Sequence, residues 1–137
     1  MAMLMRRYGD QAPRELAVAP SLGRARELLT ESLESDLSIG DVAAAVDLSP
    51  YHLMRAFRRR FGQPMHAYRL GARVERAKGL IRSSDEPLAA IALDCGFADQ
   101  SHLSRWFKKI AGMTPGDYRG AYRTNWRSVH SQSALKA

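Results

Sequence analysis

Cysteine is nearly absent from this sequence, since Cys95 is the only one among 137 residues. A single cysteine excludes an internal disulfide and a zinc site of the paired-cysteine type, and it is typical of the reducing cytoplasm. Long apolar runs are absent as well, because no segment approaches the roughly 18 apolar residues that a membrane span needs. The few apolar residues before Arg6 and Arg7 are too short a run for the core of a signal peptide. We therefore expect a cytoplasmic protein with no membrane partner.

Strand patterns are missing too, because no stretch alternates apolar and polar residues with a period of two. What is present is a globular composition, 45% apolar and 26% charged, with a net charge of +7 and a pI of about 10.1. This imbalance favours a polyanionic partner, which leaves nucleic acid, an anionic membrane or an acidic protein open, although many basic domains bind no polyanion. The length fits one domain, or two very small ones that share a core.

The chain repeats itself. Residues 51–59 read YHLMRAFRR, and residues 101–109 read SHLSRWFKK. The copies align at an offset of 50 downstream of this point, as Arg69 and Arg119 do, and at an offset of 49 upstream of it. One residue is therefore inserted between DLSPY and GFADQS. An insertion confined to one point marks a turn, and the two copies are interpreted as a duplicated supersecondary unit.

Each copy predicts a short helix, a tight turn and a longer helix. In the first copy, Ser38 and Asp41 form a capping-box pattern before VAAAV. Asp47 occupies the turn, because aspartate tolerates the left-handed conformation. The longer helix is capped by Ser49 and ends at Gly62.

The second copy carries equivalent signals. Pro87 starts the short helix, Gly96 makes the turn, Asp99 caps the longer helix and Gly112 ends it. The sequence therefore predicts an all-α fold with about seven helices, in which two helix-turn-helix units are joined by a long linking helix. We expect a poorly ordered N-terminal stub over residues 1–20, the first unit over 21–64, the linking helix over 65–82, the second unit over 83–122 and a C-terminal tail over 123–137.

The longer helix of each copy is amphipathic in the same way. Its apolar side comprises Leu53, Ala56, Phe57 and Phe61 in the first copy and Leu103, Trp106, Phe107 and Ile110 in the second. Neither helix carries an acidic residue between its cap and its end. An ordinary solvated face usually mixes signs to gain i,i+4 pairs, so two purely basic faces favour a functional interpretation.

Duplex DNA accounts for this arrangement, because its major groove admits an α-helix whose early residues reach base edges while later cations meet phosphates. The candidate base-reading residues are Tyr51, Met54 and Arg55 in the first copy and Gln100, Ser101, Ser104 and Arg105 in the second. The candidate phosphate contacts are Arg58, Arg59, Lys108 and Lys109. Because the two sets of reading residues differ, they predict an asymmetric site. A linking helix of about 17 residues spans roughly 25 Å, and flanking residues would supply the rest of the roughly 34 Å between successive grooves.

The second copy, PLAAIALDCGFADQSHLSRWFKKIAGMTPGDYR, resembles the C-terminal signature of the AraC/XylS family of bacterial transcription regulators. The first copy, DVAAAVDLSPYHLMRAFRRRFGQPMHAYR, resembles the remainder of that family's DNA-binding domain. The resemblance covers about residues 22–120. It implies two helix-turn-helix units in successive major grooves of double-stranded DNA, and transcriptional control that is most often activation through RNA polymerase.

Most members of that family carry an effector-binding or dimerisation domain before this one, whereas no effector domain is visible here. We therefore expect either a piece of a longer regulator or a short member that lacks the sensor.

The rival classes are enzymes and other binding modules. Cys95 lies near His102, but it matches Val46 in the repeat, which predicts a small core residue rather than a nucleophile. His52 and His102 match each other without further ligands nearby, which predicts structural roles, and no phosphate-binding glycine loop is present. The sequence therefore predicts no enzyme, no cofactor and no metal. RNA binding is disfavoured, because no aromatic-bearing sheet or clamp loop is predicted. A sequence-indifferent DNA-coating protein and a protein-interaction module remain alternatives.

Overall fold

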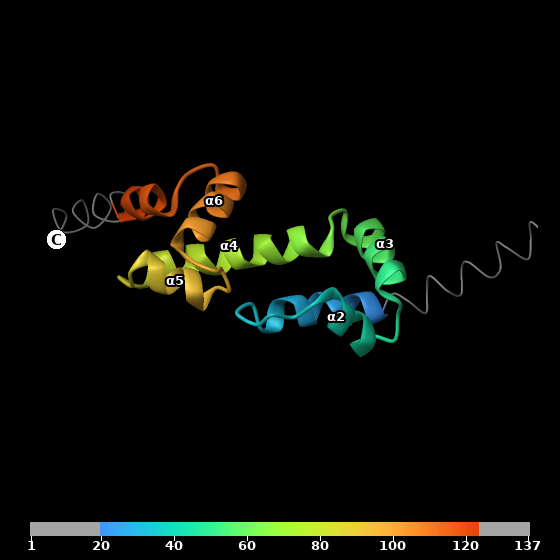
Figure 1. Cartoon of the computed structure of the whole chain (residues 1–137). Helices are drawn as coiled ribbons and strands as arrows, with labels where there is room; N and C mark the ends of the chain where they lie inside the picture. Colours follow the sequence, from blue (N-terminus) through green and yellow to red (C-terminus); the bar gives the residue numbers. More distant parts are fainter. Residues whose placement is uncertain (1–19, 124–137) are drawn as a thin grey trace, which may run out of the picture. The chain divides into compact units, whose positions relative to one another are not determined.

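The computed structural model describes residues 20–123, and the expectations for the two ends of the chain lie outside this range. Over the described residues the fold is all-helical, with seven helices and no strand, as predicted. The helices are residues 20–31, α2 (Ile39–Ala45), α3 (Pro50–Phe61), α4 (Met65–Ser83), α5 (Leu88–Asp94), α6 (Gln100–Ala111) and residues 115–123 (Figure 1). None of the described helices is both long and apolar enough to cross a membrane.

The helices form two compact units, whose boundary lies between Arg69 and Leu70 inside α4. Unit 1 contains the first helix, α2, α3 and the start of α4. Unit 2 contains the rest of α4, α5, α6 and the last helix. The long helix expected over residues 65–82 is observed as α4 (Met65–Ser83), and each unit uses one part of it to complete its own core.

The core of unit 1 is built around Leu53 and Phe57 of α3, which are both fully buried. The Phe57 ring contacts Phe61 and Tyr68, with ring centroids 4.5 Å and 5.5 Å away. The cluster is completed by Leu22, Ala25, Leu29, Val42, Ala43, Val46 and Met65. Full burial of one such Leu or Phe side chain stabilises the fold by about 1.5–3 kcal/mol, so α3 is fixed with its apolar side inward.

The local signals in unit 1 are in the predicted places. Ser38 and Asp41 form a complete capping box, and Ser49 caps α3 by accepting from the His52 N–H. Asp47 adopts a φ of 57° in the turn, and Gly62 ends α3 with a φ of 79°. The left-handed conformation is costly for most residues other than glycine, and aspartate is among those that adopt it most readily. These residues set where α3 begins and ends.

The core of unit 2 repeats this plan around Leu103 and Phe107 of α6, both fully buried. It also contains Val74, Ala77, Ile81, Ile91, Ala92, Cys95 and Phe97. The interpretation of Cys95 as a core residue is confirmed, since its side chain is completely buried. Asp99 caps α6, while Gly96 and Gly112 adopt φ angles of 91° and 84° as the turn and the helix end require.

One apolar position was assigned to the wrong environment. Ile110 was expected on the buried side of α6 but is 44% exposed. Ile110 belongs neither to the buried cluster around Leu103 and Phe107 nor to the partly buried residues packed against it. Arg60, which matches Ile110 in the repeat, is exposed as well, and its guanidinium lies 5.5 Å from the centre of the Phe61 ring.

Each unit has one arginine, at matched positions of the repeat, that joins a later helix to the segment before the short helix. The buried Arg69 of α4 donates from Nη2 to the Ser35 and Ser32 carbonyls at 2.7 Å and 3.0 Å, and from Nη1 to the Leu37 carbonyl at 3.0 Å. Burial lowers the pKa of Arg69 from its usual value, while Asp36 and Glu34 oppose this effect. In unit 2, Arg119 donates to the Glu86 carbonyl at 2.7 Å. Both arginines therefore hold the segment that leads into the short helix of their unit.

Candidate nucleic-acid interface

The outward face of α3 presents the predicted residues of unit 1. Tyr51 is 66% exposed and Met54 is 41% exposed, so both project from the surface despite their apolar groups. Arg55, Arg58 and Arg59 are also exposed. Within the described part of the chain, none of these three arginines forms an ion pair with a carboxylate. Their charge is therefore available to an external anion.

Tyr51 and Arg55 form a pair on this face. Nη1 of Arg55 donates to the Tyr51 hydroxyl at 3.3 Å, and the guanidinium lies 5.5 Å from the centre of the Tyr51 ring. The residues are four apart and therefore lie one above the other on the helix. The contact holds the arginine against the ring, which reduces the entropy that the side chain would lose on binding an external anion.

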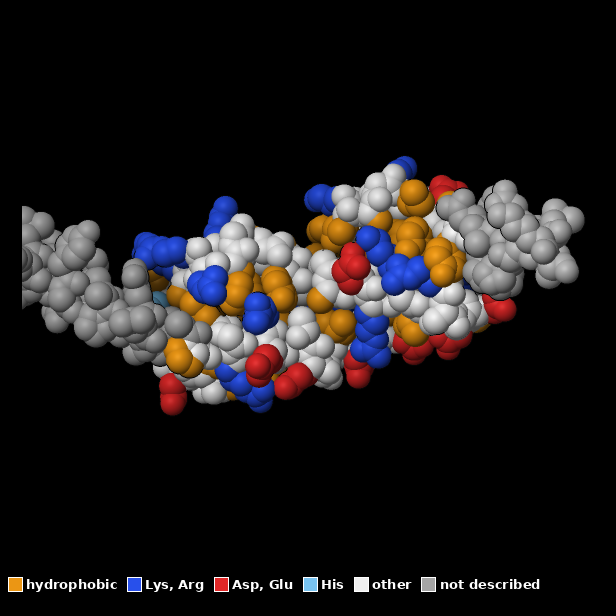
Figure 2. All heavy atoms as spheres, turned by 180° about the vertical axis from the view of Figure 1, so that it is seen from behind, with side chains coloured by type: hydrophobic (Ala, Val, Ile, Leu, Met, Phe, Trp, Pro, Cys, Tyr) orange, Lys and Arg blue, Asp and Glu red, His pale blue; other side chains and the backbone are white. Residues whose placement is uncertain are grey.

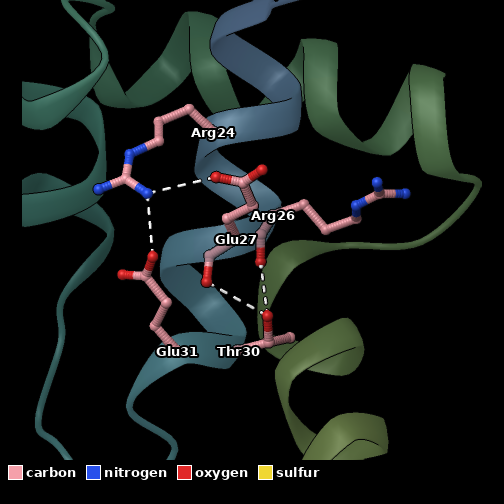
Figure 3. A network of polar contacts seen from close by, with 5 residues as sticks. All are labelled: Arg24, Arg26, Glu27, Thr30 and Glu31. Atoms are coloured by element: carbon pink, nitrogen blue, oxygen red, sulfur yellow. Dashed lines mark hydrogen bonds and ion pairs between the residues drawn. The ribbon is translucent and has the colours of Figure 1, made fainter.

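Cations on the first helix of unit 1 are engaged in a different way (Figure 3). Arg24 contacts Glu31 at 3.0 Å and Glu27 at 3.3 Å, and these two carboxylates raise its pKa above the usual value. Arg26 points away from this network and lies 5.2 Å from the centre of the Phe61 ring. The ion pairs that an ordinary solvated helix shows are thus present on this helix and absent from α3.

The outward face of α6 presents the predicted residues of unit 2. Gln100, Ser101 and Arg105 are exposed, and Ser104 lies half-buried at the border with the apolar side. Lys108 and Lys109 are exposed too, and neither they nor Arg105 pair with a carboxylate anywhere in residues 20–123. The Lys109 ammonium lies 4.9 Å from the centre of the Trp106 ring, so this cation is the one drawn toward the apolar side.

A shallow hollow lies at the start of α6. It is lined by Ala98, Asp99, Ser101, His102 and Arg105. Two of the predicted reading residues, Ser101 and Arg105, thus border one surface depression with the helix cap. In the space-filling view, Lys and Arg side chains lie among apolar, uncharged and acidic ones on the face drawn rather than in one block (Figure 2).

Sequence reasoning did not foresee the surroundings of His102. It accepts a hydrogen bond at Nδ1 from the Ala98 N–H at 3.2 Å, and its ring packs edge-on against Phe97. The matched His52 is exposed, and its side chain forms no hydrogen bond, ion pair or ring contact within the described residues. The insertion between the two copies was the signal, because Ala98 is the residue that unit 1 lacks. No group of His, Cys, Asp and Glu residues in residues 20–123 could hold a metal ion.

Comparison with known proteins identifies the arrangement. A sequence profile described as a helix-turn-helix domain matches residues 42–121. The chain belongs to the AraC-type helix-turn-helix family. It is 36% identical over 86 residues to the arabinose operon regulatory protein of Escherichia coli strain K12, a match that covers 63% of this chain and 30% of that protein.

Two further similarities support the assignment. The transcriptional activator RhaR of Yersinia pestis bv. Antiqua, strain Angola, is 32% identical over 113 residues, which covers 82% of this chain and 39% of RhaR. The DNA-binding domain of AdpA, solved in complex with a target DNA, superposes with a TM-score of 0.72 at 28% identity and covers 76% of this chain and 94% of that one. The AraC-type chain thus spans about a third of the length of these curated relatives. Its family is one of DNA-binding transcription regulators and not of enzymes.

Proposed function

We propose that this AraC-type domain binds double-stranded DNA sequence-specifically and regulates transcription from the cytoplasm of a bacterium. The carrying observation is the set of exposed cations on α3 and α6, which occupy matched positions and have no carboxylate partner in the described part of the chain. Groups with this charge release condensed counterions from the phosphate backbone, which supplies most of the affinity for DNA. The complex of the similar AdpA domain with its target DNA supports the same partner.

In this proposal, α3 and α6 enter successive major grooves of an asymmetric site. Base edges are read by Tyr51, Met54, Arg55, Gln100, Ser101, Ser104 and Arg105. Phosphates are contacted by Arg58, Arg59, Lys108 and Lys109. The functional segments are the two helix-turn-helix units over residues 21–64 and 83–122 and the linking segment over 65–82. The asymmetry follows from the different side chains at matched positions, because an aromatic hydroxyl and a thioether do not prefer the bases that amide and hydroxyl groups prefer.

Activation is the regulatory mode that the similarity to a transcriptional activator such as RhaR supports. We propose that it acts through contact with RNA polymerase. The test is an in-vitro transcription assay on a template that carries the selected binding site, with and without this protein. An increase in transcript supports activation, and a decrease indicates repression.

Selection of bound duplexes from a random pool tests sequence-specific binding directly. We expect one consensus with two conserved blocks about one helical turn apart. A matched competition assay then compares the selected site with an unrelated duplex of equal length. If both duplexes compete equally, the protein coats DNA without reading it, and the proposed specificity is wrong.

A further inference from the structure

The turn before α6 contains a backbone donor that unit 1 does not have. When the two copies are aligned at the turn, Phe97 corresponds to Leu48 and the cap Asp99 corresponds to the cap Ser49, so Ala98 is the inserted residue. Its N–H lies in the exposed turn before α6 and has no intrahelical acceptor. Nδ1 of His102 accepts its hydrogen bond at 3.2 Å.

This hydrogen bond fixes the protonation pattern of the imidazole ring. A backbone N–H can only donate, so the Nδ1 atom that receives it carries no proton. The proton of the neutral ring is then on Nε2. The ring plane is held as well, because it packs edge-on against the buried Phe97 with centroids 5.3 Å apart and planes at 84°. His102 therefore presents a defined N–H donor rather than a freely rotating ring.

That donor has no partner in the protein. No residue within 20–123 accepts a hydrogen bond from Nε2, and His102 is only half-buried. The residue borders the hollow at the start of α6 together with Ser101 and Arg105. The Asp99 carboxylate borders the same hollow and caps α6 by accepting a hydrogen bond from the backbone N–H of His102 at 2.7 Å. Arg105 supplies a charge of the opposite sign to the same hollow.

We propose that His102 is a DNA-contact residue of unit 2, which donates its Nε2–H to a phosphate oxygen of the DNA backbone beside α6. The side chain reaches back toward the turn, and a residue at this edge of the recognition helix meets the backbone rather than the base edges. The inference rests on the proposed function. It assigns to unit 2 a contact that unit 1 does not make, because the matched His52 is exposed and has no such hydrogen bond in the described part of the chain.

The His102→Asn substitution distinguishes the role of the Nδ1 atom from that of the Nε2–H group. The Asn side-chain oxygen lies near the position of Nδ1 and keeps an acceptor for the Ala98 N–H, whereas the outward donor is lost. His52→Asn is the matched control in unit 1. Binding of both variants is measured on the selected site and on an unrelated duplex at several salt concentrations, and melting curves show that they remain folded.

We expect His102→Asn to melt like the parent and to bind every duplex about tenfold more weakly, since a hydrogen bond to a charged group is lost. The salt dependence should not change, because a neutral donor displaces no condensed cation. His52→Asn should bind like the parent. In the free protein, a long-range proton–nitrogen correlation spectrum should show the His102 proton on Nε2.

Three outcomes would overturn the inference alone: unchanged affinity of a folded His102→Asn, a change of base preference in place of a uniform loss, or a proton found on Nδ1. If the parent protein bound no duplex at all, the proposed function would fail and this inference would fail with it.

Discussion

At the scale of single residues, two arginines at matched positions have different surroundings. Arg55 lies against the Tyr51 ring and donates to its hydroxyl, whereas Arg105 borders the hollow beside Ser101 and His102. Both are exposed on the outward face within the first two turns of their helix. A planar fork with several donors suits a guanine edge, while the ammonium of Lys108 acts as a point charge that suits phosphate.

These differences lead to a prediction about the two arginines that are proposed to contact base edges. Arg105→Ala should weaken binding to the preferred site by about 1–3 kcal/mol and relax discrimination at one or two base pairs. Arg55→Ala should do the same about one helical turn away. Lys108→Ala, the matched control for charge, should weaken all sequences similarly and reduce the salt slope by about one unit. The measurement is site selection with each variant.

If Arg55→Ala left both affinity and profile unchanged while Arg105→Ala abolished them, α3 would be a scaffold. The proposal that both helices read DNA would then be wrong.

At the scale of elements, each short helix is held in place from both sides. Its outgoing turn is set by a residue with positive φ, Asp47 in unit 1 and Gly96 in unit 2. Its incoming segment is held by an arginine from a later helix, Arg69 or Arg119. Arg69 is the stronger of the two ties, because it serves three carbonyl groups while Arg119 serves one.

Arg69→Lys should therefore cost more than Arg119→Lys. A lysine lacks the planar fork and cannot serve the Ser32, Ser35 and Leu37 carbonyls together. Leaving buried carbonyls without donors should lower the free energy of unfolding by about 2–3 kcal/mol, against about 1 kcal/mol for the single bond of Arg119. Chemical denaturation measures both values, and hydrogen exchange should show faster opening over residues 32–38 in Arg69→Lys only. Equal losses in the two variants would contradict this account.

The start of α2 predicts a dependence on pH. The Ser38 N–H donates to the Asp41 carboxylate at 3.0 Å, and this contact with the backbone and hydroxyl of Ser38 lowers the pKa of Asp41 from its ordinary value of 3.8. A lowered folded-state pKa means that the stabilisation is fully present above pH 3.8 and is lost as the pH falls through the lowered value.

Asp41→Asn should consequently be less stable than the parent near neutral pH, and the gap should close below pH 3.8. Asn keeps a side-chain acceptor, so the comparison reports the charge rather than the cap itself. Thermal melting at neutral and acidic pH provides the measurement. A gap that widened on acidification would show that the charge of Asp41 does not stabilise α2.

At the scale of the whole molecule, much of the fold could be predicted from the repeat, because caps, turn residues and the insertion are local signals. The ends of α3 and α6 followed from Ser49, Gly62, Asp99 and Gly112. The exposure of Ile110 could not be predicted, since helical periodicity shows which side is apolar but not how far the core extends along it. The bonds of Arg69 could not be predicted either, because they join α4 to carbonyls of residues 32–37, whose approach only the folded chain defines.

The exposed cations predict the salt dependence of binding. If about six phosphate contacts form, the logarithm of the binding constant should fall with the logarithm of salt concentration with a slope of about −5. Titrations of the selected site at several salt concentrations measure this slope. A substitution that changes no charge, such as Ser104→Ala, should leave the slope unchanged. A flat dependence would exclude phosphate contacts as the main source of affinity.

Two separate cores predict that a core defect stays within its unit. Phe107→Ala should destabilise unit 2 by about 3–5 kcal/mol, because the ring is fully buried. Phe57→Ala is the matched variant in unit 1. Hydrogen exchange should show lost protection mainly in residues 70–123 for Phe107→Ala and mainly before residue 70 for Phe57→Ala. Equal loss throughout the chain in both variants would mean that the units unfold as one.

If α3 and α6 both bind DNA as proposed, the continuous helix α4 keeps them covalently tethered when either one dissociates from its half of the site. The tether keeps the released helix at a high effective concentration near its half of the site, so recapture competes with escape. Complete dissociation then requires both helices to be unbound at the same time. Residence time on a full site should therefore exceed what either half-site sustains alone, although no contact is stronger in the full site than in the halves.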